Sequence, residues 1–355
     1  QVMDSGDENS AMALMALGAS RLAVQLQSTG RIDGLLVLGG TMGTDLAIDV
    51  ASSLPLGVPK VVLSTVAFSP LLPPERMPPD LMMVLWAGGL YGLNSLCQSA
   101  LAQAAGAVVG ACRVARAPRF ERPVVGMTSL GSSCLKYMVQ LQPELDKRGF
   151  DLAVFHTTGM GGRAFELLTA QGQFACVMDL SLQEMVNQMG GSVVSAGPDR
   201  LMGAGLKGVP MIVAPGATDL VDYPAWGQMP ESFAGRPSHD HNRLIASVGI
   251  DADMRREFAR ELASRLRQAR GPVHLVLPLQ GIQEWDRAGA PLHDPEGLAA
   301  MMDEMAQCDW GAAEVSRIDA HINDAAFVQH VLAVFDDWLA KGLVVPAAGM
   351  KAPHV

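Results

Sequence analysis

Short apolar runs of strand length alternate with longer mixed segments along most of the chain. The first run is Gly34–Leu38, followed by a segment of helical character at Asp45–Leu54 and a second apolar run at Lys60–Ser64. A strand, a helix and a further strand in this order predict a βαβ unit with parallel strands. The runs contain Val and Leu without alternation, which indicates strands that are buried on both faces.

The same alternation starts again near Arg122 and continues through the rest of the sequence. We expect strands at 123–127, 152–156, 174–178, 211–214, 273–277 and near Val315, with helices at 133–147, 162–170, 181–189, 253–270, 295–308 and 324–341. The pattern predicts an α/β protein with two Rossmann-like, doubly wound subdomains and mainly parallel sheets. A single core stops growing at roughly 250–300 residues. We therefore place an N-terminal subdomain at residues 1–120 and a C-terminal α/β subdomain at 121–355, separated by the charged, Pro-rich segment 113–123.

Two segments depart from this regular pattern. Nothing before Leu35 supplies the opening strand of such a subdomain, so we expect residues upstream to be missing and the first subdomain to lack its first strand. Residues 215–243 are rich in Trp, Pro and Gly and read as a long irregular stretch. A loop of that length inside a compact domain is usually functional or an interface arm.

The segment from Leu81 to Cys112 carries no charged side chain. Gly, Asn and Gln interrupt it, whereas a membrane-spanning helix needs about 20 predominantly apolar residues. We expect a buried core or subunit-interface helix here and no membrane association. One small domain cannot cover helices that are apolar nearly all round, so we also expect a homo-oligomer, a dimer or larger.

Composition narrows the class of protein. The net charge is −10 and the 26 Lys and Arg residues are scattered, which argues against a protein that binds the nucleic-acid backbone. The five cysteines form no CxxC pair, as expected for a cytoplasmic protein in a reducing environment without structural zinc. An acidic protein can still bind a small anionic ligand through main-chain N–H groups.

The first candidate binding loop lies between the first predicted strand and helix. It consists of Gly39, Gly40, Thr41, Met42, Gly43 and Thr44. Free N–H groups and the positive end of a helix dipole hold phosphate at such a place, and threonine hydroxyls add donors. The loop lacks the Lys-Ser/Thr of a Walker A motif and is not GxGxxG. A tight turn between strand and helix is the alternative.

A second loop of the same kind follows the strand that ends at His156. It consists of Thr157, Thr158, Gly159, Met160, Gly161, Gly162 and Arg163. In a doubly wound fold the carboxyl ends of the strands open toward one crevice, so residues 64–67 and 128–133 are further lining candidates. We expect Gly161→Val to abolish anion binding and to leave the fold largely intact.

Other polar residues follow the predicted strands. In the segment Ser195–Leu201, Arg200 could pair with a phosphate or carboxylate, although Pro198 and Asp199 also suit an ordinary helix start. Asp179 could accept from a ribose hydroxyl or hold Mg²⁺ through water, or it could cap the next helix.

Catalytic candidates are Cys134, His156 and Glu184. Cys134 falls in the first turn of a predicted helix, where the dipole lowers a thiol pKa, and His156 could act as its base. A buried, inert cysteine is the alternative. His239 and His241 have spacing that could bind a metal but lack a third ligand in sequence, so whether a metal binds stays open.

Several of these motifs occur together in one known family. They are Gly39–Thr44, Pro55–Lys60, Ser64–Ala67, Gly92–Asn94, Thr157–Arg163, Ala196–Arg200 and His321–Asp324. In this order the chain resembles the Tm-type ATP-binding family, which includes plant tomato mosaic virus resistance proteins and many uncharacterised bacterial members. The resemblance runs over nearly the whole chain. It implies two Rossmann-like subdomains, a homodimer, and ATP with Mg²⁺ in the crevice between the subdomains.

The resemblance also implies roles for individual residues. It puts phosphate on Gly39–Thr44 and on the loop with Thr158, Gly159, Gly161, Gly162 and Arg163, and it places Ser64, Thr65, Val66, Ala67, Asn94, Asp179 and Gly197 around the nucleotide. The chain departs from the family at Thr41–Met42, where Gly and Ser are usual, and at Asp45, which follows directly. The alternative function is an enzyme of hydrolase or lyase type. It would act on a small acyl, keto or carboxylate substrate in the same crevice.

Overall fold

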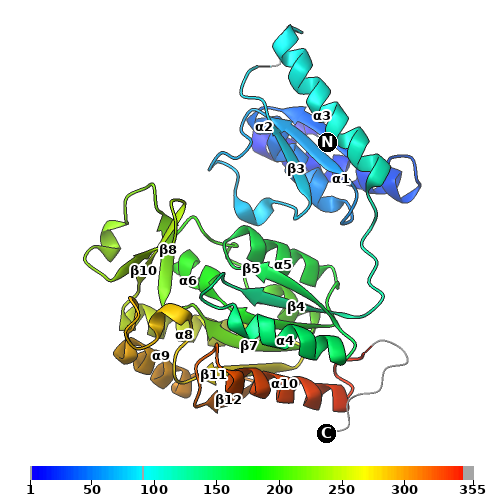
Figure 1. The fold of residues 1–355 in the computed structure, drawn as a ribbon. Coiled ribbons are helices and arrows are strands. Elements are labelled where there is room, and N and C mark those ends of the chain that lie inside the picture. The colour runs from blue at the N-terminus through cyan, green and yellow to red at the C-terminus, as the bar shows by residue number, and fades with distance from the viewer. Residues whose placement is uncertain (1, 90–91, 347–355) are drawn as a thin grey trace. The chain divides into compact units, whose positions relative to one another are not determined.

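The computed structural model describes residues 2–89 and 92–346. The chain divides into two compact units, Gln1–Arg119 and Phe120–Val355, and each is an α/β structure (Figure 1). The expected α/β class with mainly parallel sheets is confirmed, because the units contain parallel sheets of three and six strands.

The smaller unit is built on a three-stranded parallel sheet in the order β1-β2-β3. Its elements are η1 (Val2–Asp4), α1 (Glu8–Ser28), β1 (Leu35–Gly39), α2 (Thr41–Ser53), β2 (Lys60–Ser64), η2 (Pro74–Arg76), β3 (Leu81–Leu85) and α3 (Ser95–Val114). The central strand β2 is buried along its whole length, as its unbroken apolar run predicts. Helix α1 was not predicted; its N-cap residue Asp7 accepts from the N–H of Ser10.

The larger unit is built on a six-stranded parallel sheet in the order β12-β11-β7-β6-β4-β5. Its strands are β4 (Val124–Ser129), β5 (Asp151–His156), β6 (Cys176–Ser181), β7 (Met211–Gly216), β11 (Val273–Pro278) and β12 (Glu314–Ile318). Its helices are α4 (Lys136–Lys147), α5 (Met160–Ala170), α6 (Gln183–Met189), α7 (Met202–Lys207), α8 (Ala252–Leu266), α9 (Pro295–Gln307) and α10 (Ala325–Ala340), with single turns η3 (Glu231–Phe233) and η4 (Glu284–Asp286).

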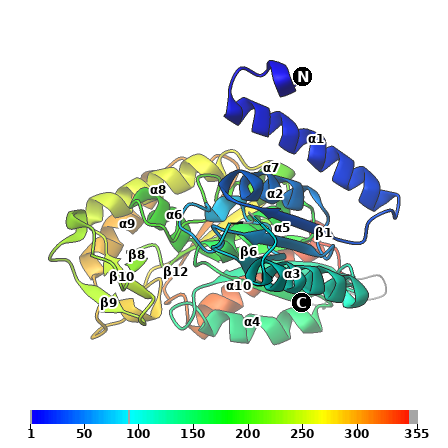
Figure 2. The same cartoon turned by 90° about the horizontal axis from the view of Figure 1, so that it is seen from above.

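Helices cover both faces of this sheet, as a doubly wound fold requires. Helices α4 and α10 pack against each other on one face, and α5 and α7 pack together on the other (Figure 2). The main core lies under α4 and α10, where Phe150 meets Phe335 edge to face with ring centroids 5.1 Å apart. This packing holds the carboxyl ends of β4, β5 and β6 in fixed positions.

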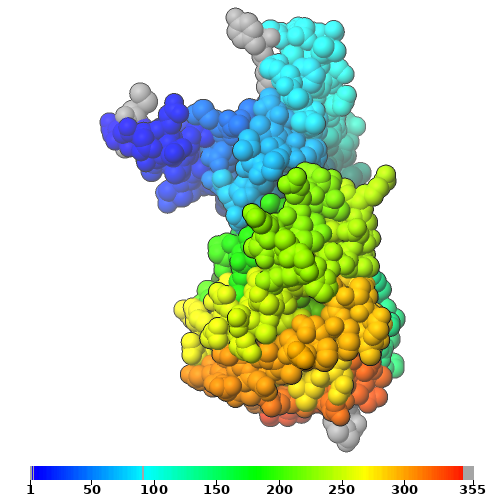
Figure 3. Space-filling model, turned by 90° about the vertical axis from the view of Figure 1, so that its left-hand side faces the viewer, coloured from blue at the N-terminus to red at the C-terminus, as the bar shows by residue number. Residues whose placement is uncertain are grey.

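Part of the stretch expected to be irregular forms a small antiparallel sheet. Strand β10 (Ile245–Gly249) lies between β8 (Leu220–Pro224) and β9 (Ser238–Asp240). Figure 3 shows this region in yellow-green as a continuous part of the surface, next to the orange surface that includes α9. The expectation of a wholly irregular segment at residues 215–243 is therefore wrong.

The uncharged segment 81–112 is not one helix, whereas we expected a buried core or subunit-interface helix. It contains β3 and most of α3, and it passes through residues 90–91, which lie outside the described part. In the described residues, α3 is one helix that is long and apolar enough to cross a membrane, which by itself is weak evidence. Cys97, Ala100 and Ala104 are buried on one side of α3, while only 17% of its apolar window is buried.

Candidate functional site

The strand order of the larger unit identifies the edge at which a ligand is expected to bind. Strand β4 pairs with β5 on one side and with β6 on the other. The chain thus runs from β4 toward one edge of the sheet to form β5 and then crosses back toward the other edge to form β6, so the strand order reverses beside β4. In open α/β sheets, ligands bind at the carboxyl ends of the strands at this switch point. The loops after β4, β5 and β6 are therefore the first place to look for a site.

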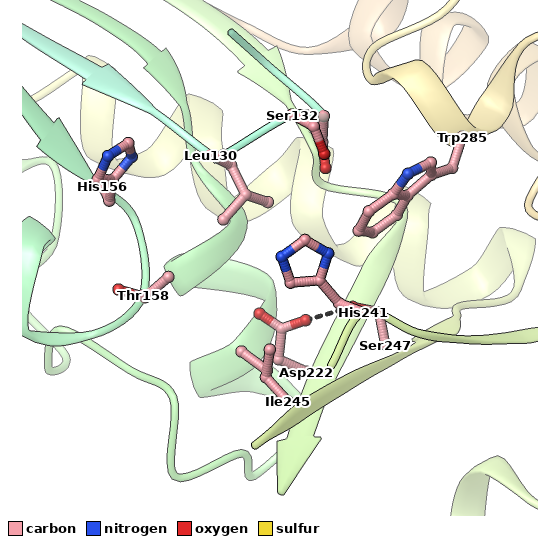
Figure 4. A pocket seen from close by; sticks show the side chains of 11 residues that line it. Leu130, Ser132, His156, Thr158, Asp222, His241, Ile245, Ser247 and Trp285 are labelled. Carbon is pink, nitrogen blue, oxygen red and sulfur yellow. Dashed lines mark hydrogen bonds between the residues drawn. The ribbon is translucent and has the colours of Figure 1, made fainter. Parts of the chain in front are cut away.

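A pocket of about 220 Å³ lies at this edge. It is lined by Leu130, Gly131, Ser132, Ser133, His156, Thr158, Asp222, His241, Ile245, Ser247 and Trp285. The loops after β4 and β5 contribute one side, and β8, β10 and Trp285 contribute the other. In Figure 4 the imidazole of His241 lies between Trp285 and Asp222, with Ser132 facing the same space from the opposite side.

The loop after β4 presents main-chain donors to the pocket. The N–H groups of Ser133 and Cys134 both donate to the carbonyl of Leu130, at 3.0 and 3.1 Å, and Gly131 adopts φ +44° within this turn. Within the described residues, the N–H groups of Gly131 and Ser132 have no hydrogen-bond partner. The loop therefore offers two N–H donors and the Ser132 hydroxyl to a ligand.

A buried carboxylate forms the floor of the pocket. Asp222 Oδ1 accepts a 2.5 Å hydrogen bond from the Ser247 hydroxyl, and the Asp222 N–H donates to Asn187 Oδ1 at 2.7 Å. Asn187 Nδ2 lies 3.5 Å from Oδ2, and the side chains of Gln183 and His241 also act on the carboxyl group and lower its pKa. Burial raises the pKa of Asp222 to about 6. The group is thus fixed in position and mostly ionised at neutral pH.

Aromatic rings form one wall of the pocket. The ring centroid of Trp285 lies 4.2 Å from that of His239 and 5.6 Å from that of His241. The main-chain N–H of Trp285 donates to Gln283 Oε1 at 2.8 Å, which caps the single turn η4 that carries the indole. The two histidines pack on an indole, and the described residues contain no group of three His, Cys, Asp or Glu side chains able to hold a metal.

The glycine-rich loop after β5 is closed by a carboxylate from the protein itself. Glu184 Oε1 accepts from the N–H groups of Gly159 and Gly162, at 2.6 and 3.1 Å. Met160 and Gly161 form the first turn of α5, and their N–H groups make no hydrogen bond within the described residues. Two of the four amides at this helix start are therefore already occupied.

A Cβ atom would not fit at two positions of this loop. At Gly161 it would lie 1.8 Å from the carbonyl oxygen of His156, and at Gly162 it would lie 1.7 Å from Glu184 Oε2. Both glycines are thus required by packing. The expectation that Gly161→Val leaves the fold largely intact is wrong, because the clash is with the main chain at the end of β5.

Beneath the loop, Arg200 is fully buried among three carboxylates. Its guanidinium binds Asp179 through two hydrogen bonds, of 2.6 and 2.7 Å, and Glu184 Oε2 at 2.9 Å. Glu166 Oε1 lies 3.0 Å from Nη1 and completes the cluster. Asp179 also accepts from the Thr128 hydroxyl at 2.7 Å. Asp179 and Glu184 are therefore both ion-pair partners of Arg200. The sequence alone did not indicate that these three side chains meet.

The segment that precedes Arg200 lies against the same loop. A Cβ at Gly159 would be 3.1 Å from the carbonyl oxygen of Ser195. Gly197 adopts φ +101° and donates to Ser195 Oγ at 3.0 Å. Arg163 pairs with Asp199 at 2.9 Å. The segment that contains Gly197 thus lies against the glycine-rich loop through Ser195 and Asp199, and the nucleotide contact expected of Gly197 stays a prediction.

The catalytic candidates separate in the structure. His156 is exposed and lines the pocket, whereas Cys134 is fully buried and donates from Sγ to the Ile282 carbonyl at 3.6 Å. Helix α4 begins only at Lys136, so placing Cys134 in its first turn was wrong. Burial raises the pKa of the Cys134 thiol well above its ordinary value. These contacts match the alternative of an inert core cysteine.

The candidate residues of the smaller unit gather at the carboxyl ends of β1 and β2. Helix α2 begins at Thr41, directly after Gly40, and Gly39 lies so close to Gly43 that a Cβ would be 2.6 Å from its Cα. The hydroxyls of Thr44 and Ser64 are 2.6 Å apart. The loop therefore joins strand and helix by close packing.

Neighbouring contacts at this edge involve Thr65, Val66 and Asn94. The Thr65 N–H donates to the Gly39 carbonyl at 3.1 Å, and the Val66 N–H donates to Ser64 Oγ at 3.0 Å. Asn94 caps α3 by accepting from Leu96 and Cys97. The nucleotide contacts expected of Thr41, Met42, Thr44, Ala67 and Asn94 stay predictions, as does a nucleotide between the two units.

The fold and the pocket define the protein as a two-unit α/β protein with a pocket at the switch point of its larger sheet. Family comparison supplies the particular relationship. The C-terminal domain model of the uncharacterised protein family UPF0261 matches residues 122–339, and its N-terminal domain model matches residues 1–117. The chain belongs to the UPF0261 family.

Three relatives show the range of this family. A UPF0261 protein of Brucella melitensis is 56% identical over 344 residues, which cover 97% of this chain and 82% of the relative. A UPF0261 protein of Clostridium tetani is 30% identical over 90% of this chain and 80% of its own length. The tomato protein ToMV resistance protein Tm-1(GCR237) is 28% identical over 92% of this chain and 44% of its own length. The resemblance to the Tm-type family is confirmed.

Proposed function

We propose that the larger unit binds a nucleotide, ATP with Mg²⁺, in the pocket at the carboxyl ends of β4 and β5. The observation that carries this proposal is that the N–H groups of Gly131 and Ser132 have no partner in the part of the chain that the structure describes, and that they share one pocket with the indole of Trp285. Main-chain N–H groups bind phosphate oxygens, and an aromatic face stacks on a base. A nucleotide presents both groups on one molecule.

The phosphates have a second set of donors beside this loop. Thr158 lines the pocket, and the N–H groups of Met160 and Gly161, which have no hydrogen-bond partner among the described residues, follow at the start of α5. The positive end of a helix dipole favours an anion at this place. Because Glu184 already holds Gly159 and Gly162, we assign phosphate binding chiefly to Gly131 and Ser132.

The size of the pocket limits how much of ATP it encloses. Its volume of about 220 Å³ is below the ~300–1,000 Å³ of sites that surround a drug-sized ligand. The base and sugar fill it, and the phosphates extend along the open loops. Mg²⁺ is usually held by substrate phosphates, waters and one or two carboxylates. Asp179 is engaged by Arg200 and Thr128, so the phosphates and water supply most ligands of the ion.

The test is calorimetric titration of the full chain with Mg-ATP, comparing Trp285→Ala with Trp226→Ala. Trp226 is 77% exposed and does not line the pocket, which makes it the matched control. Loss of one stacked base costs about 1–3 kcal/mol, so Trp285→Ala should bind roughly 5- to 150-fold more weakly while Trp226→Ala binds as the unchanged protein. Absence of saturable heat, or equal affinity of the two variants, would refute the proposal.

An enzyme acting in the same pocket is the second candidate, and one observation favours it. Asp222, with its raised pKa, shares the pocket with His156 and His241. A carboxyl group whose pKa lies near neutrality suits general acid–base chemistry. Release of ADP from Mg-ATP by the unchanged chain, and its loss in Asp222→Asn with binding retained, would favour this candidate over simple binding.

A further inference from the structure

The floor of the pocket is built as a cross-strand pair. Asp222 on β8 lies directly opposite Ser247 on β10 in the antiparallel register, and their side chains share a 2.5 Å hydrogen bond. Asn187 holds the Asp222 main chain from the other side at 2.7 Å. Asp222 and Ser247 are both about 2% exposed. Two buried polar side chains are thus held in one orientation at the base of a pocket.

The polar atoms at the floor of the pocket that remain available to a ligand are hydrogen-bond acceptors. Because an ionised carboxylate can only accept hydrogen bonds, the Ser247 hydroxyl donates to Asp222 Oδ1. Its oxygen keeps lone pairs that can accept a hydrogen bond from a ligand. Asp222 Oδ2 has a 3.5 Å contact with Asn187 Nδ2, which is at the limit of a hydrogen bond, and the Gln183 side chain is a further weak partner of the carboxyl group. The floor therefore presents two neighbouring acceptors, Asp222 Oδ2 and Ser247 Oγ.

Two neighbouring acceptors fit a ligand group with two neighbouring donors. The two hydroxyls of a ribose are such a group, and a carboxylate at this edge of an α/β sheet is a known partner of ribose hydroxyls. The amino edge of adenine offers a donor next to an acceptor nitrogen, and the Asp222–Ser247 pair would leave that nitrogen unpaired. Phosphate donors at Gly131 and Ser132 lie in the same pocket.

We propose that Asp222 and Ser247 bind the 2′- and 3′-hydroxyls of the ligand, so that the site selects ribonucleotides over deoxyribonucleotides. This inference rests on the proposed nucleotide-binding function and adds its specificity. Asp222 takes the role that the sequence suggested for Asp179, whose two oxygens are held by Arg200 and Thr128 and which does not line the pocket.

The experiment compares four ligands on the unchanged full chain by calorimetry in the presence of Mg²⁺. ATP and ITP keep both hydroxyls, whereas 2′-deoxy-ATP and 3′-deoxy-ATP each lack one. A hydrogen bond to a charged group is worth about 10- to 100-fold in affinity. We expect each deoxy compound to bind weaker than ATP by about that factor, and ITP to bind about as ATP does, because its ribose is unchanged.

Two variants connect this selectivity to the floor. Ser247→Ala and Asp222→Asn should lower the affinity for ATP to that for the deoxy compounds. The affinity for the deoxy compounds themselves should change little. Asp309→Asn, at an exposed aspartate outside the pocket, is the control. If a floor variant fails to fold, the ligand series on the unchanged chain still decides the question.

The possible failures are distinguishable. If ATP binds and 2′-deoxy-ATP binds equally well, the ribose assignment is overturned and nucleotide binding stands. If only ITP binds more weakly than ATP, the ribose assignment is overturned as well, because the floor would then recognise the base and not the sugar. If none of the four ligands binds, both proposals fall.

Discussion

Arg200 and Asp179 form a bidentate ion pair in the interior of the larger unit, with hydrogen bonds of 2.6 and 2.7 Å. Both side chains are at most 1% exposed. The pair connects the segment before α7 to the carboxyl end of β6, directly beneath the glycine-rich loop. Removing one partner of such a pair leaves an uncompensated buried charge.

The first prediction concerns this cluster. Arg200→Met should lower the free energy of unfolding by about 3–5 kcal/mol, because three buried carboxylates lose their counter-charge. Arg163→Met is the control, since Arg163 pairs with Asp199 at the surface and such pairs contribute at most about 1 kcal/mol. Urea denaturation of the two variants measures the difference. Similar losses in both would show that the cluster does not stabilise the fold.

The second prediction is a pH dependence of stability. Burial raises the pKa of Glu184 from 4.5 to about 7, despite the opposing effect of Arg200. A group whose pKa is raised by folding contributes stability below its unfolded pKa and loses that contribution as the pH rises through its folded pKa. The free energy of unfolding should therefore fall between about pH 5 and about pH 8.

Glu184→Gln tests this directly, because it removes the titrating group and keeps the shape of the side chain. The variant should show a flatter pH profile in urea denaturation. Asp219 and Asp222 also have pKa values raised to about 6, so part of the slope below about pH 6 should remain. Parallel profiles for the two proteins would contradict the assignment to Glu184.

The third prediction concerns the glycine-rich loop. Gly162→Ala should destabilise the larger unit by at least about 1–3 kcal/mol, because the new Cβ would meet Glu184 Oε2. Gly249→Ala is the matched control in the same unit, since its Cβ meets nothing closer than 3.5 Å. Thermal unfolding of the two variants compares them. Equal melting temperatures would mean that Glu184 does not hold the loop.

The fourth prediction concerns cysteine reactivity. Cys134 should be protected from iodoacetamide in the native protein and should react in denaturant, because burial raises its pKa and excludes the reagent. Cys112 and Cys308 are partly exposed and should react first. Mass spectrometry after a short exposure gives the order. Rapid native-state alkylation of Cys134, prevented by a ligand, would favour the enzyme over the binding protein.

The fifth prediction is the dimer or larger oligomer expected from the uncharged helix. On α3, Val109 is 49% exposed and Val114 is 76% exposed, and a Cβ at Gly106 or Gly110 would meet nothing within 4 Å. We expect a homo-oligomer at micromolar concentration by light scattering and a smaller mass for Val109→Asp. Val139→Asp, at an exposed valine of α4, should leave the mass unchanged. A monodisperse monomer of the unchanged chain would contradict the expectation.

Most strands and helices around the parallel sheets were predictable because their signal is local, but β3 (Leu81–Leu85) was missed, because it lies in the uncharged segment that was expected to be a helix. The run Lys60–Ser64 is a strand with the predicted bounds, and Val273–Leu277 is a strand that extends by one residue. The antiparallel strands β8, β9 and β10 were missed. They are short and contain polar residues such as Asp222 and Ser247, so their apolar signal is weak. Their pairing depends on contacts between residues that are far apart in the sequence.

The site was only partly predictable for the same reason. His156, Thr158 and Ser132 follow strands and could be found from the rule that parallel strands end at one edge. Asp222, His241 and Trp285 come from the small sheet and from η4, and nothing in the local sequence marks them as neighbours. The carboxylate of Glu184 on the glycine-rich loop was equally hidden, because Gly159 and Glu184 are 25 positions apart.

The two sides of the pocket belong to different structural layers. Gly131 and Ser132 lie in the loop that follows β4 of the parallel sheet, whereas Asp222 and Ser247 lie in the small antiparallel sheet and His241 lies in the loop between β9 and β10. With the proposed function, substitutions in residues 220–249 would alter the floor of the pocket without disturbing the main-chain donors on the other side. We therefore expect that exchanging this one segment would change the ligand preference proposed for the pocket and would leave the scaffold intact.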